Sequence, residues 1–480
     1  MSFDLSNNVN STKVFIEQKV NVIGRWDPFY YRPNLVSLEK RVCKASALCL
    51  RQFVRGMAGG ATPSTREAEI HYTDKNGGIP FIRVQNLSTT GQLNLEDCKK
   101  INRSTHDGLL RRSRLSGGEL LVKITGVGRM AVASVVPENF EGNINQHIVA
   151  IRTDDIKTSE ILAAYLNLDI AEQLASRRST GGTRPALDYP ALLSIPIIFD
   201  ERIMLLMKDA VARYEEQVKE AKSLLASIDD ILLDELGIPS QAEPPNTLES
   251  RIFKSNFTTL TGQRWDPLYH QADIFDFVRD TECGLIRLGD KVDYFITGFP
   301  AGRNDQVYGD EGGIIQIRPT NLSNDRELVF NRNIYIAASE LEARKASLLK
   351  RDEVLFNNIN SQEQVGKTVW FDLEGNYFCS NHITRIGVKS CELAPQYLAY
   401  ILNLYQRRKV FFKLCTNWNN QSGVGSDILK CIPIPLPKFT RQTEIVTRLE
   451  TVRTQARTLR EQARADFEKA KREIETLILS

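Results

Sequence analysis

Two stretches of the chain carry apolar residues at steps of three and four, the spacing of a coiled-coil seam. The first runs from Asp200 to Gly237 and places them at Ile203, Met207, Ala210, Tyr214, Val218, Ala221, Leu225, Ile228 and Leu232. The second runs from Phe439 to the C-terminus and places them at Ile445, Leu449, Val452, Ala456, Leu459, Ala463, Phe467, Ala470, Ile474 and Leu477. A period near 3.5 residues predicts one long helix in each stretch, each roughly 50–60 Å in length.

Helices of this length need a partner that covers their apolar stripe, because a lone helix is only marginally stable in water. The economical interpretation is that the two helices pack on each other antiparallel. Parallel association between two chains, or a single helix that awaits another protein, remain alternatives.

The segment before each long helix has a different pattern. Short β-type runs such as Leu120–Ile124 and Ile148–Ile151 alternate with Gly, Asn and Ser, and a helix is predicted at Ser159–Arg177. The fold class is therefore α+β. We predict a first globular segment, a long helix, a proline-rich linker, a second globular segment and a second long helix, at residues 1–199, 200–237, 238–263, 264–438 and 439–480.

The two globular segments repeat the same phrases, in the same order, about 235 residues apart. The pairs are Arg25–Pro28 and Arg264–Pro267, Gly77–Ser88 and Gly312–Ser323, His147 and His382, Leu162–Leu168 and Leu398–Leu404, and Ile195–Ile197 and Ile432–Ile434. Ordered matches at nearly constant spacing indicate a tandem duplication of one globular domain followed by one long helix.

Composition narrows the classes of protein. No run of 18 apolar residues and no charged-then-apolar leader occur in the 480 residues, so we expect neither a membrane span nor a signal peptide. Eight cysteines without a C-x-x-C pair favour reduced thiols in the cytoplasm. Because the net charge is only +3, a surface that binds nucleic acid has to be a local patch.

Three phrases resemble catalytic motifs and lack what the chemistry requires. Gly126–Ala131 fits a dinucleotide loop, but β-type residues follow it where that loop needs a helix. Gly366–Thr368 matches the end of a phosphate-binding loop, but the glycine that such a loop needs five positions earlier is replaced by Ser361. Asp27–Tyr30 lacks the second proline of adenine methyltransferases, and no histidines have metal-ligand spacing. We therefore predict no enzyme activity and no metal site in this chain.

The repeated phrases resemble the target recognition domains of Type I restriction–modification specificity subunits. The phrases that carry the resemblance are Leu115–Leu121 with Gly126–Gly128, Asp352–Lys367, the strand endings Ile195–Ile197 and Ile432–Pro435, and the helix opening Arg441–Ile445. The first long helix departs from the family, because Asp200–Ile203 lacks the glutamine of that opening. The similarity covers almost the whole chain, in the order domain, helix, domain, helix.

The resemblance implies two target recognition domains held apart by an antiparallel coiled coil, each reading one half of an asymmetric, bipartite DNA target. The resemblance also implies three kinds of partner: double-stranded DNA, methyltransferase subunits and restriction/translocase subunits. Two methyltransferase subunits are expected. S-adenosylmethionine, ATP and Mg are then expected in those partner subunits, with no cofactor in this chain.

Candidate DNA contacts lie where the two repeats differ. Arginine can pair with phosphate or a guanine edge, and asparagine or glutamine with adenine. In the first repeat the candidates are Lys123, Arg129, Arg177, Arg178, Thr180, Thr183 and Arg184. In the second they are Asn357, Asn358, Asn360, Ser361, Asn417, Trp418, Asn419, Asn420 and Gln421. For each residue, a place in the core or in a solvated loop is the competing interpretation.

Two other functions fit the same architecture. One is a coiled-coil scaffold whose repeats bind protein, and the other is a specificity subunit of a different methylation-based defence system. Loops rich in Arg and Asn on a shared framework favour DNA recognition over the scaffold.

Overall fold

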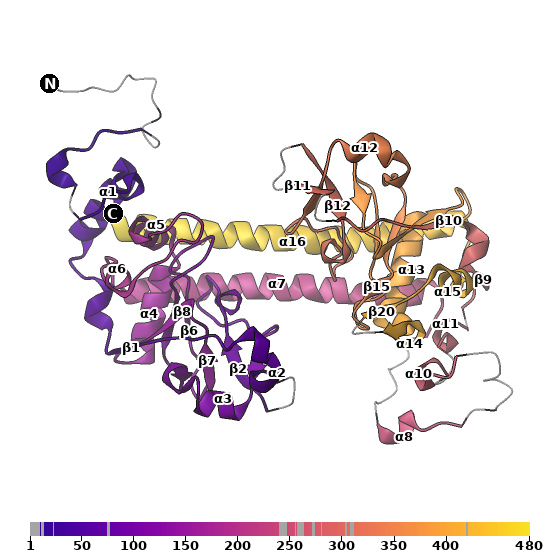
Figure 1. Ribbon diagram of the computed structural model, residues 1–480, viewed down its shortest axis with the longest axis horizontal. Helices are drawn as coiled ribbons and strands as arrows, with labels where there is room; N and C mark the ends of the chain where they lie inside the picture. Colours follow the sequence, from indigo (N-terminus) through magenta and orange to yellow (C-terminus); the bar gives the residue numbers. More distant parts are fainter. Residues whose placement is uncertain are drawn as a thin grey trace. The chain divides into compact units, whose positions relative to one another are not determined.

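The computed structural model divides the chain into two compact units. Unit 1 is Met1–Val218 with Arg460–Ser480, and unit 2 is Lys219–Leu459. Both combine helices with open β-sheets (Figure 1). The structure describes residues 10, 14–22, 24–73, 77–239, 247–254, 256, 264–270, 274–279, 281–302, 305–307, 312–418 and 421–480.

Unit 1 contains two four-stranded sheets. The first is antiparallel, in the order β1 (Gly56–Gly59), β8 (Ile148–Arg152), β5 (Leu120–Lys123) and β6 (Ala133–Val135). The second has the order β3 (Lys99–Ile101), β2 (Ile79–Ile82), β7 (Gly142–Ile144) and β4 (Arg114–Leu115), with β2 and β7 parallel. Its shorter helices are α1 (Pro33–Ala45), α2 (Ala68–His71), α3 (Arg103–Asp107), α4 (Ile156–Leu166), α5 (Asp169–Arg178) and α6 (Tyr189–Leu193).

Unit 2 has a corresponding antiparallel sheet in the order β10 (Val292–Thr297), β18 (Ile383–Val388), β14 (Val354–Asn357) and β16 (Thr368–Trp370). Its mixed sheet has the order β11 (Gln306–Val307), β13 (Ile334–Ala337), β12 (Gly313–Ile317) and β17 (Phe378–Cys379), with β12 and β17 parallel. Two smaller sheets join β15 (Ile359–Asn360), β20 (Gln421–Gly423) and β19 (Thr416–Trp418), and β21 (Pro433–Pro435) with β9 (Leu285–Arg287).

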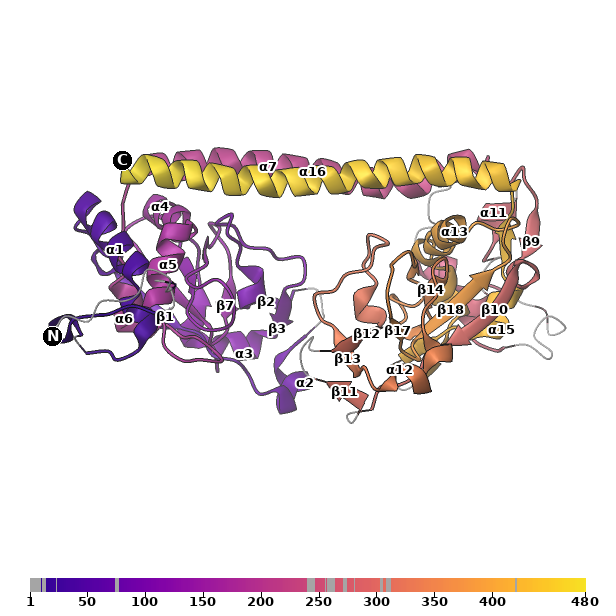
Figure 2. The ribbon, with the colours of Figure 1, turned by 90° about the horizontal axis from the view of Figure 1, so that it is seen from above.

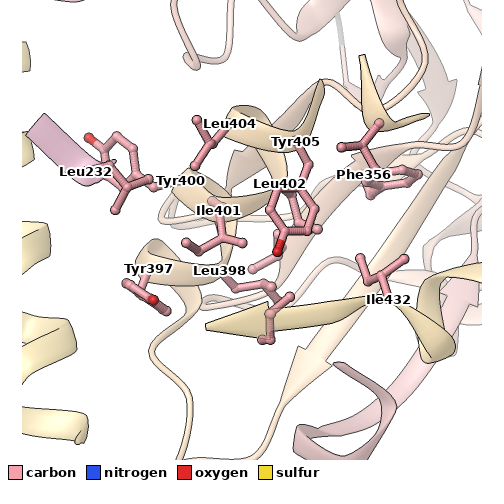
Figure 3. Close-up of a cluster of buried hydrophobic side chains, with 14 of the residues drawn as sticks. Leu232, Phe356, Tyr397, Leu398, Tyr400, Ile401, Leu402, Leu404, Tyr405 and Ile432 are labelled. Carbon is pink, nitrogen blue, oxygen red and sulfur yellow. The ribbon is translucent and has the colours of Figure 1, made fainter. Parts of the chain in front are cut away.

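The short helices of unit 2 are α8 (Leu248–Arg251), α10 (Pro267–His270), α11 (Asp276–Arg279), α12 (Glu340–Ala343), α13 (Pro395–Arg407), α14 (Val410–Leu414) and α15 (Ser426–Cys431). Helix α13 lies in the centre of the hydrophobic core, and every residue from Tyr397 to Tyr405 is buried. Figure 3 shows its side chains beside Phe356 of β14 and Ile432. Apart from Asn403, this stretch carries apolar or aromatic side chains on every face, and such a helix is stable only when it is enclosed in this way.

The two predicted long helices are α7 (Glu201–Glu235) and α16 (Phe439–Leu479), and each contributes to both units. In unit 1 the ring of Tyr214 lies 5.4 Å from that of Phe467. In unit 2 Arg441 forms an ion pair of 2.5 Å with Glu235. Early α7 thus meets late α16, and late α7 meets early α16, so the helices run in opposite directions within each unit (Figures 1 and 2).

Asparagines of the repeated Leu-Asn-Leu phrase join a helix to a strand in the same way in both units. The Asn167 side-chain amide donates to the Ala133 carbonyl at 2.8 Å and accepts from its N–H at 3.1 Å. Asn403 does the same with Thr368, at 2.7 and 3.1 Å. Asn167 is 0% and Asn403 6% exposed, so these amides satisfy backbone groups that water does not reach. This contact explains why the phrase occurs twice.

The repeated Arg-Trp-Asp-Pro phrase also has one structural role. Arg25 donates to the carbonyls of Arg178 and Ser179, both at 2.8 Å, and to Asp27. Arg264 donates to the carbonyls of Leu414 and Cys415 and to Asp266. The last carbonyls of a helix have no partner within it. Each arginine therefore closes the end of the helix that precedes a candidate loop.

The buried ion pair Arg385–Glu353 in unit 2 generates a stability prediction. Both side chains are 2% exposed and lie 2.7 Å apart, and Tyr294 also donates to Glu353 at 2.7 Å. We expect Arg385→Leu to lower the free energy of unfolding by about 3–5 kcal/mol, because it leaves a buried carboxylate without its cation. Urea denaturation of the full chain, monitored by a spectroscopic probe in unit 2, measures the change in the free energy of unfolding.

The matched control is Arg351→Leu, which removes an arginine from the exposed pair with Glu374, 3.8 Å apart. Exposed pairs contribute little, so its denaturation midpoint should stay close to that of the wild type. Equal effects of the two substitutions would contradict the importance of the buried pair.

Candidate functional site

In unit 1 two distant segments meet beside the end of β5. The Ile124 N–H donates to the His147 carbonyl at 2.9 Å, and the Leu187 N–H donates to the Ile124 carbonyl at 2.8 Å. Ala186 forms β-bridges with both Thr125 and Thr180. Residues 124–131 and 180–187 thus form one surface, which we call the first loop surface.

Unit 2 repeats this backbone pattern. The Asn358 N–H donates to the His382 carbonyl at 3.1 Å, and the Val424 N–H donates to the Asn358 carbonyl at 2.9 Å. In unit 2 a short sheet of β15, β20 and β19 takes the place of the isolated bridges of unit 1 (Figure 1). Residues 358–364, 415–418 and 421–424 form the second loop surface. The structure therefore brings the two sets of candidates in each repeat together.

Lys123 and Asn357 occupy equivalent strand ends and hold these loops from inside. Lys123 is 5% exposed, and its Nζ donates to the carbonyls of Val127 at 2.8 Å and Arg129 at 2.9 Å. Burial lowers the pKa of Lys123. Asn357 is fully buried, and its Nδ2 donates to the Gln364 carbonyl at 2.9 Å. Both side chains satisfy carbonyls of the turn that follows the strand.

Arg177 and Arg178 lie inside unit 1, 7% and 6% exposed. Both form ion pairs with Glu39, and the Arg177 guanidinium lies 4.2 Å from the centre of the Tyr30 ring. Burial lowers the pKa of both arginines. The sequence indicated charged surface residues here, whereas the structure uses both charges to attach α5 to α1.

Exposed candidates of the first loop surface cluster in the turn after α5. Thr180, Thr183 and Arg184 are all exposed. The pKa of His147 is lowered by burial and by the positive charge of Arg184. Gly181 has a φ of +93°, a conformation that glycine adopts readily and that shapes this turn.

Val127 is a surface residue that the sequence reasoning missed. It is 77% exposed between Gly126 and Gly128, which have φ values of +123° and +81°. The Gly126 N–H donates to the Pro185 carbonyl at 3.0 Å, so this tip is attached to the turn that carries Arg184. The signal available in the sequence was an apolar residue between two glycines, which a solvated turn rarely needs.

The second loop surface exposes different chemistry. Asn417, Trp418 and Gln421 are exposed, with Trp418 at 44%. The Trp418 ring lies against Gly423, where an added Cβ would be 2.4 Å from it. A side chain at position 423 would therefore displace the indole from this position.

The remaining candidates of this surface differ in exposure. Ser361 is exposed, Asn360 half-buried and Asn358 buried. The Asn360 side chain accepts from the Ser361 N–H at 2.8 Å. Asn358 Oδ1 is buried without a hydrogen-bond partner among the described residues. Asn419 and Asn420 lie outside the described residues.

Among the described residues, no group of three His, Cys, Asp or Glu side chains is arranged to hold a metal ion. No helix in the described part of the chain has the length and apolar character that a membrane crossing requires.

Sequence comparison matches residues 305–466 to the Type I restriction modification DNA specificity domain. A protein of Methanocaldococcus jannaschii, assigned by name as the type I restriction enzyme MjaX specificity subunit, is 27% identical over 94 residues. That alignment spans 19% of this chain and 22% of the relative, about a fifth of each.

Structure comparison gives chains of low sequence identity. One comes from work on complex assembly and conformational transition of the type I R-M system, with 14% identity and a TM-score of 0.39 over 90% of this chain and 95% of that chain. The HsdS subunit from Thermoanaerobacter tengcongensis is 14% identical, with a TM-score of 0.33 over the same shares. The resemblance to Type I specificity subunits is confirmed by the sequence matches: the chain carries a Type I restriction modification DNA specificity domain over residues 305–466.

Proposed function

We propose that this chain is a non-catalytic DNA sequence-specificity subunit of a Type I restriction–modification complex. In this proposal each loop surface reads one half of an asymmetric, bipartite target. The observation that carries it is the shared backbone pattern of the two surfaces, on which the exposed side chains differ. A constant framework with variable exposed groups is what two readers of two unlike half-sites require.

The first loop surface offers a cation, hydroxyls and an apolar tip. The Arg184 guanidinium can donate two hydrogen bonds to a guanine edge, and the hydroxyls of Thr180 and Thr183 suit phosphate or base edges. Val127 is placed to contact a thymine methyl. Lys123, Arg129, Arg177 and Arg178 act in this proposal as the framework behind the surface, because their charged groups are occupied by protein partners.

The second loop surface offers amides and an indole. Asn417 and Gln421 suit bidentate contacts to adenine, and Trp418 suits packing beside a sugar or base. Asn360 and Ser361 stand at the edge of the same small sheet, and Asn419 and Asn420 stay candidates on the sequence alone. Asn357 and Asn358 belong with the framework because they are buried.

The long helices act in this proposal as a spacer and as a docking surface. Packed antiparallel as a coiled coil, α7 and α16 set the distance between the two half-sites, as dimer geometry sets half-site spacing elsewhere. Leu205 and Leu206 on α7 are 54% and 41% exposed, and such apolar side chains suit a protein partner. We assign that role to two methyltransferase subunits, with restriction/translocase subunits joining through the complex in the cytoplasm.

The decisive experiment starts from the chain purified from its host together with whatever binds it. We expect native mass spectrometry to find a methyltransferase in the complex. Methylome sequencing should show adenine methylation at a split, asymmetric motif that disappears when the gene is deleted. An isolated chain with an unchanged methylome would favour the scaffold function instead.

Salt dependence provides a second measurement on the purified complex. Binding to duplex DNA should weaken steeply as salt rises, because each phosphate contact releases counterions. A slope near zero in a plot of log affinity against log salt concentration would exclude the proposed interface.

Substitution of Arg184 by alanine should weaken DNA binding and relax base preference in one half of the target only. Loss of one good bidentate contact corresponds to about 1–3 kcal/mol. Competition binding with duplexes altered in either half measures the effect.

The control for this substitution is Arg213→Ala, an exposed arginine of the same unit on α7. It should leave both halves unchanged. If Arg184→Ala weakened both halves equally, or neither, the assignment of the turn after α5 would be wrong.

Shortening the spacer tests the role of the helices. Removal of one heptad from both α7 and α16 takes away about 10 Å, or roughly three base pairs of duplex. The preferred gap between the half-sites should change accordingly in the methylome of a complemented host. An unchanged gap would show that something other than helix length sets the spacing.

A further inference from the structure

Arg129 belongs to the first loop surface, but its guanidinium points into unit 1. Nη1 bonds the carboxylate of Asp169, and Nη2 donates to the Asn167 carbonyl at 2.6 Å. The Nε atom is buried without a hydrogen-bond partner among the described residues. With both terminal nitrogens occupied by protein, this side chain fixes the shape of its loop.

Asp169 is held from its other side by helix α16. Lys471 Nζ lies 3.3 Å from the same Asp169 oxygen and 2.9 Å from Glu468. The Lys471 side chain is only 1% exposed, and an ammonium group so deeply buried depends on its ionic partners. The Asp169 carboxylate therefore forms ion pairs with two cations, Arg129 of the loop and Lys471 of the long helix.

The charge state of Asp169 agrees with this geometry. Burial opposes its ionisation, but the hydrogen bond from Arg129 and the charge of Lys471 outweigh burial and lower its pKa. The carboxylate thus stays ionised at neutral pH and can hold both cations together.

A second side chain of α16 contacts the start of α5, next to Asp169. Glu475 accepts a hydrogen bond of 2.9 Å from the N–H of Ile170, in the first turn of α5. Burial raises the pKa of Glu475. Lys471 and Glu475 together attach the start of α5 to α16, and the start of α5 provides the carboxylate that holds Arg129.

Among the described residues of the second repeat, the position that matches Asp169 carries a different side chain. The spacing that pairs Asn167 with Asn403 pairs Asp169 with Tyr405, whose hydroxyl donates to the Pro433 carbonyl at 2.7 Å. A link from the long helix through Asp169 to the loop is therefore a property of the first loop surface.

We propose that Asp169 and Lys471 are positioning residues for DNA recognition by the first loop surface. Lys471 fixes Asp169, Asp169 fixes Arg129, and Arg129 fixes the loop whose tip is Val127. The proposal rests on the proposed function. It adds that base discrimination in one half of the target depends on a side chain of helix α16 that touches no DNA.

The test is Lys471→Met in the full chain with its co-purified partners. Selection from duplexes with a randomised segment, followed by sequencing, gives the base preference at each position. We expect discrimination to fall about tenfold in one half, the size of one lost base contact. The other half should be unchanged. Lys471→Arg should restore discrimination, because it keeps the cation.

The matched control is Lys469→Met, two residues away on the same helix, whose side chain is 69% exposed and pairs with Glu473. It should leave both halves unchanged. Equal changes in both halves for Lys471→Met, or none, would overturn the positioning role. If the Lys471→Met variant does not fold, the same selection is carried out with Asp169→Asn, which keeps the shape of the side chain and removes its charge. Equal changes in both halves of the target, or none, would again overturn the positioning role. A wild-type complex without any base preference would instead refute the proposed function.

Discussion

The structure depends on one constraint: backbone groups buried where sheets and helices end must find hydrogen-bond partners. The strands are short, three or four residues in many cases, so many of their neighbours lie outside regular ladders. Side chains provide the missing bonds. Asn167 and Asn403 pair with a strand, and Arg25 and Arg264 close the ends of helices. All four of these residues belong to the phrases that the sequence repeats.

This constraint also explains why the two repeats can differ at their surfaces. The backbone bonds around His147 and His382, and the inward side chains Lys123 and Asn357, fix the loops from behind. Lysine and asparagine perform the same task here, because each needs only to donate to carbonyls of the following turn. The exposed side chains of Arg184 and Trp418 have no such framework role, so the two surfaces can differ at these positions.

The long helices do more than pack through their apolar seam. Most seam positions are buried, but two polar side chains of α16, Gln442 and Lys471, are buried as well. Gln442 accepts from the Ala394 N–H at 2.8 Å and so completes the start of α13. Glu475 does the same for α5. Helix α16 is thus attached to α13 in unit 2 and to α5 in unit 1 by specific polar contacts that a heptad pattern does not reveal.

The sequence by itself indicated the repeated phrases, the two long helices and the resemblance to a DNA specificity family, because apolar periodicity and local phrases are readable along the chain. It also located the loops that form the candidate surfaces. Only the tertiary structure decided which charged residues in those loops face outward. Arg177 and Arg178 lie beside Arg184 in the sequence, but they are buried against Glu39, some 140 residues earlier, and Arg129 meets Lys471 through Asp169. Burial of a charge depends on partners that are distant in the chain, and no local pattern encodes them.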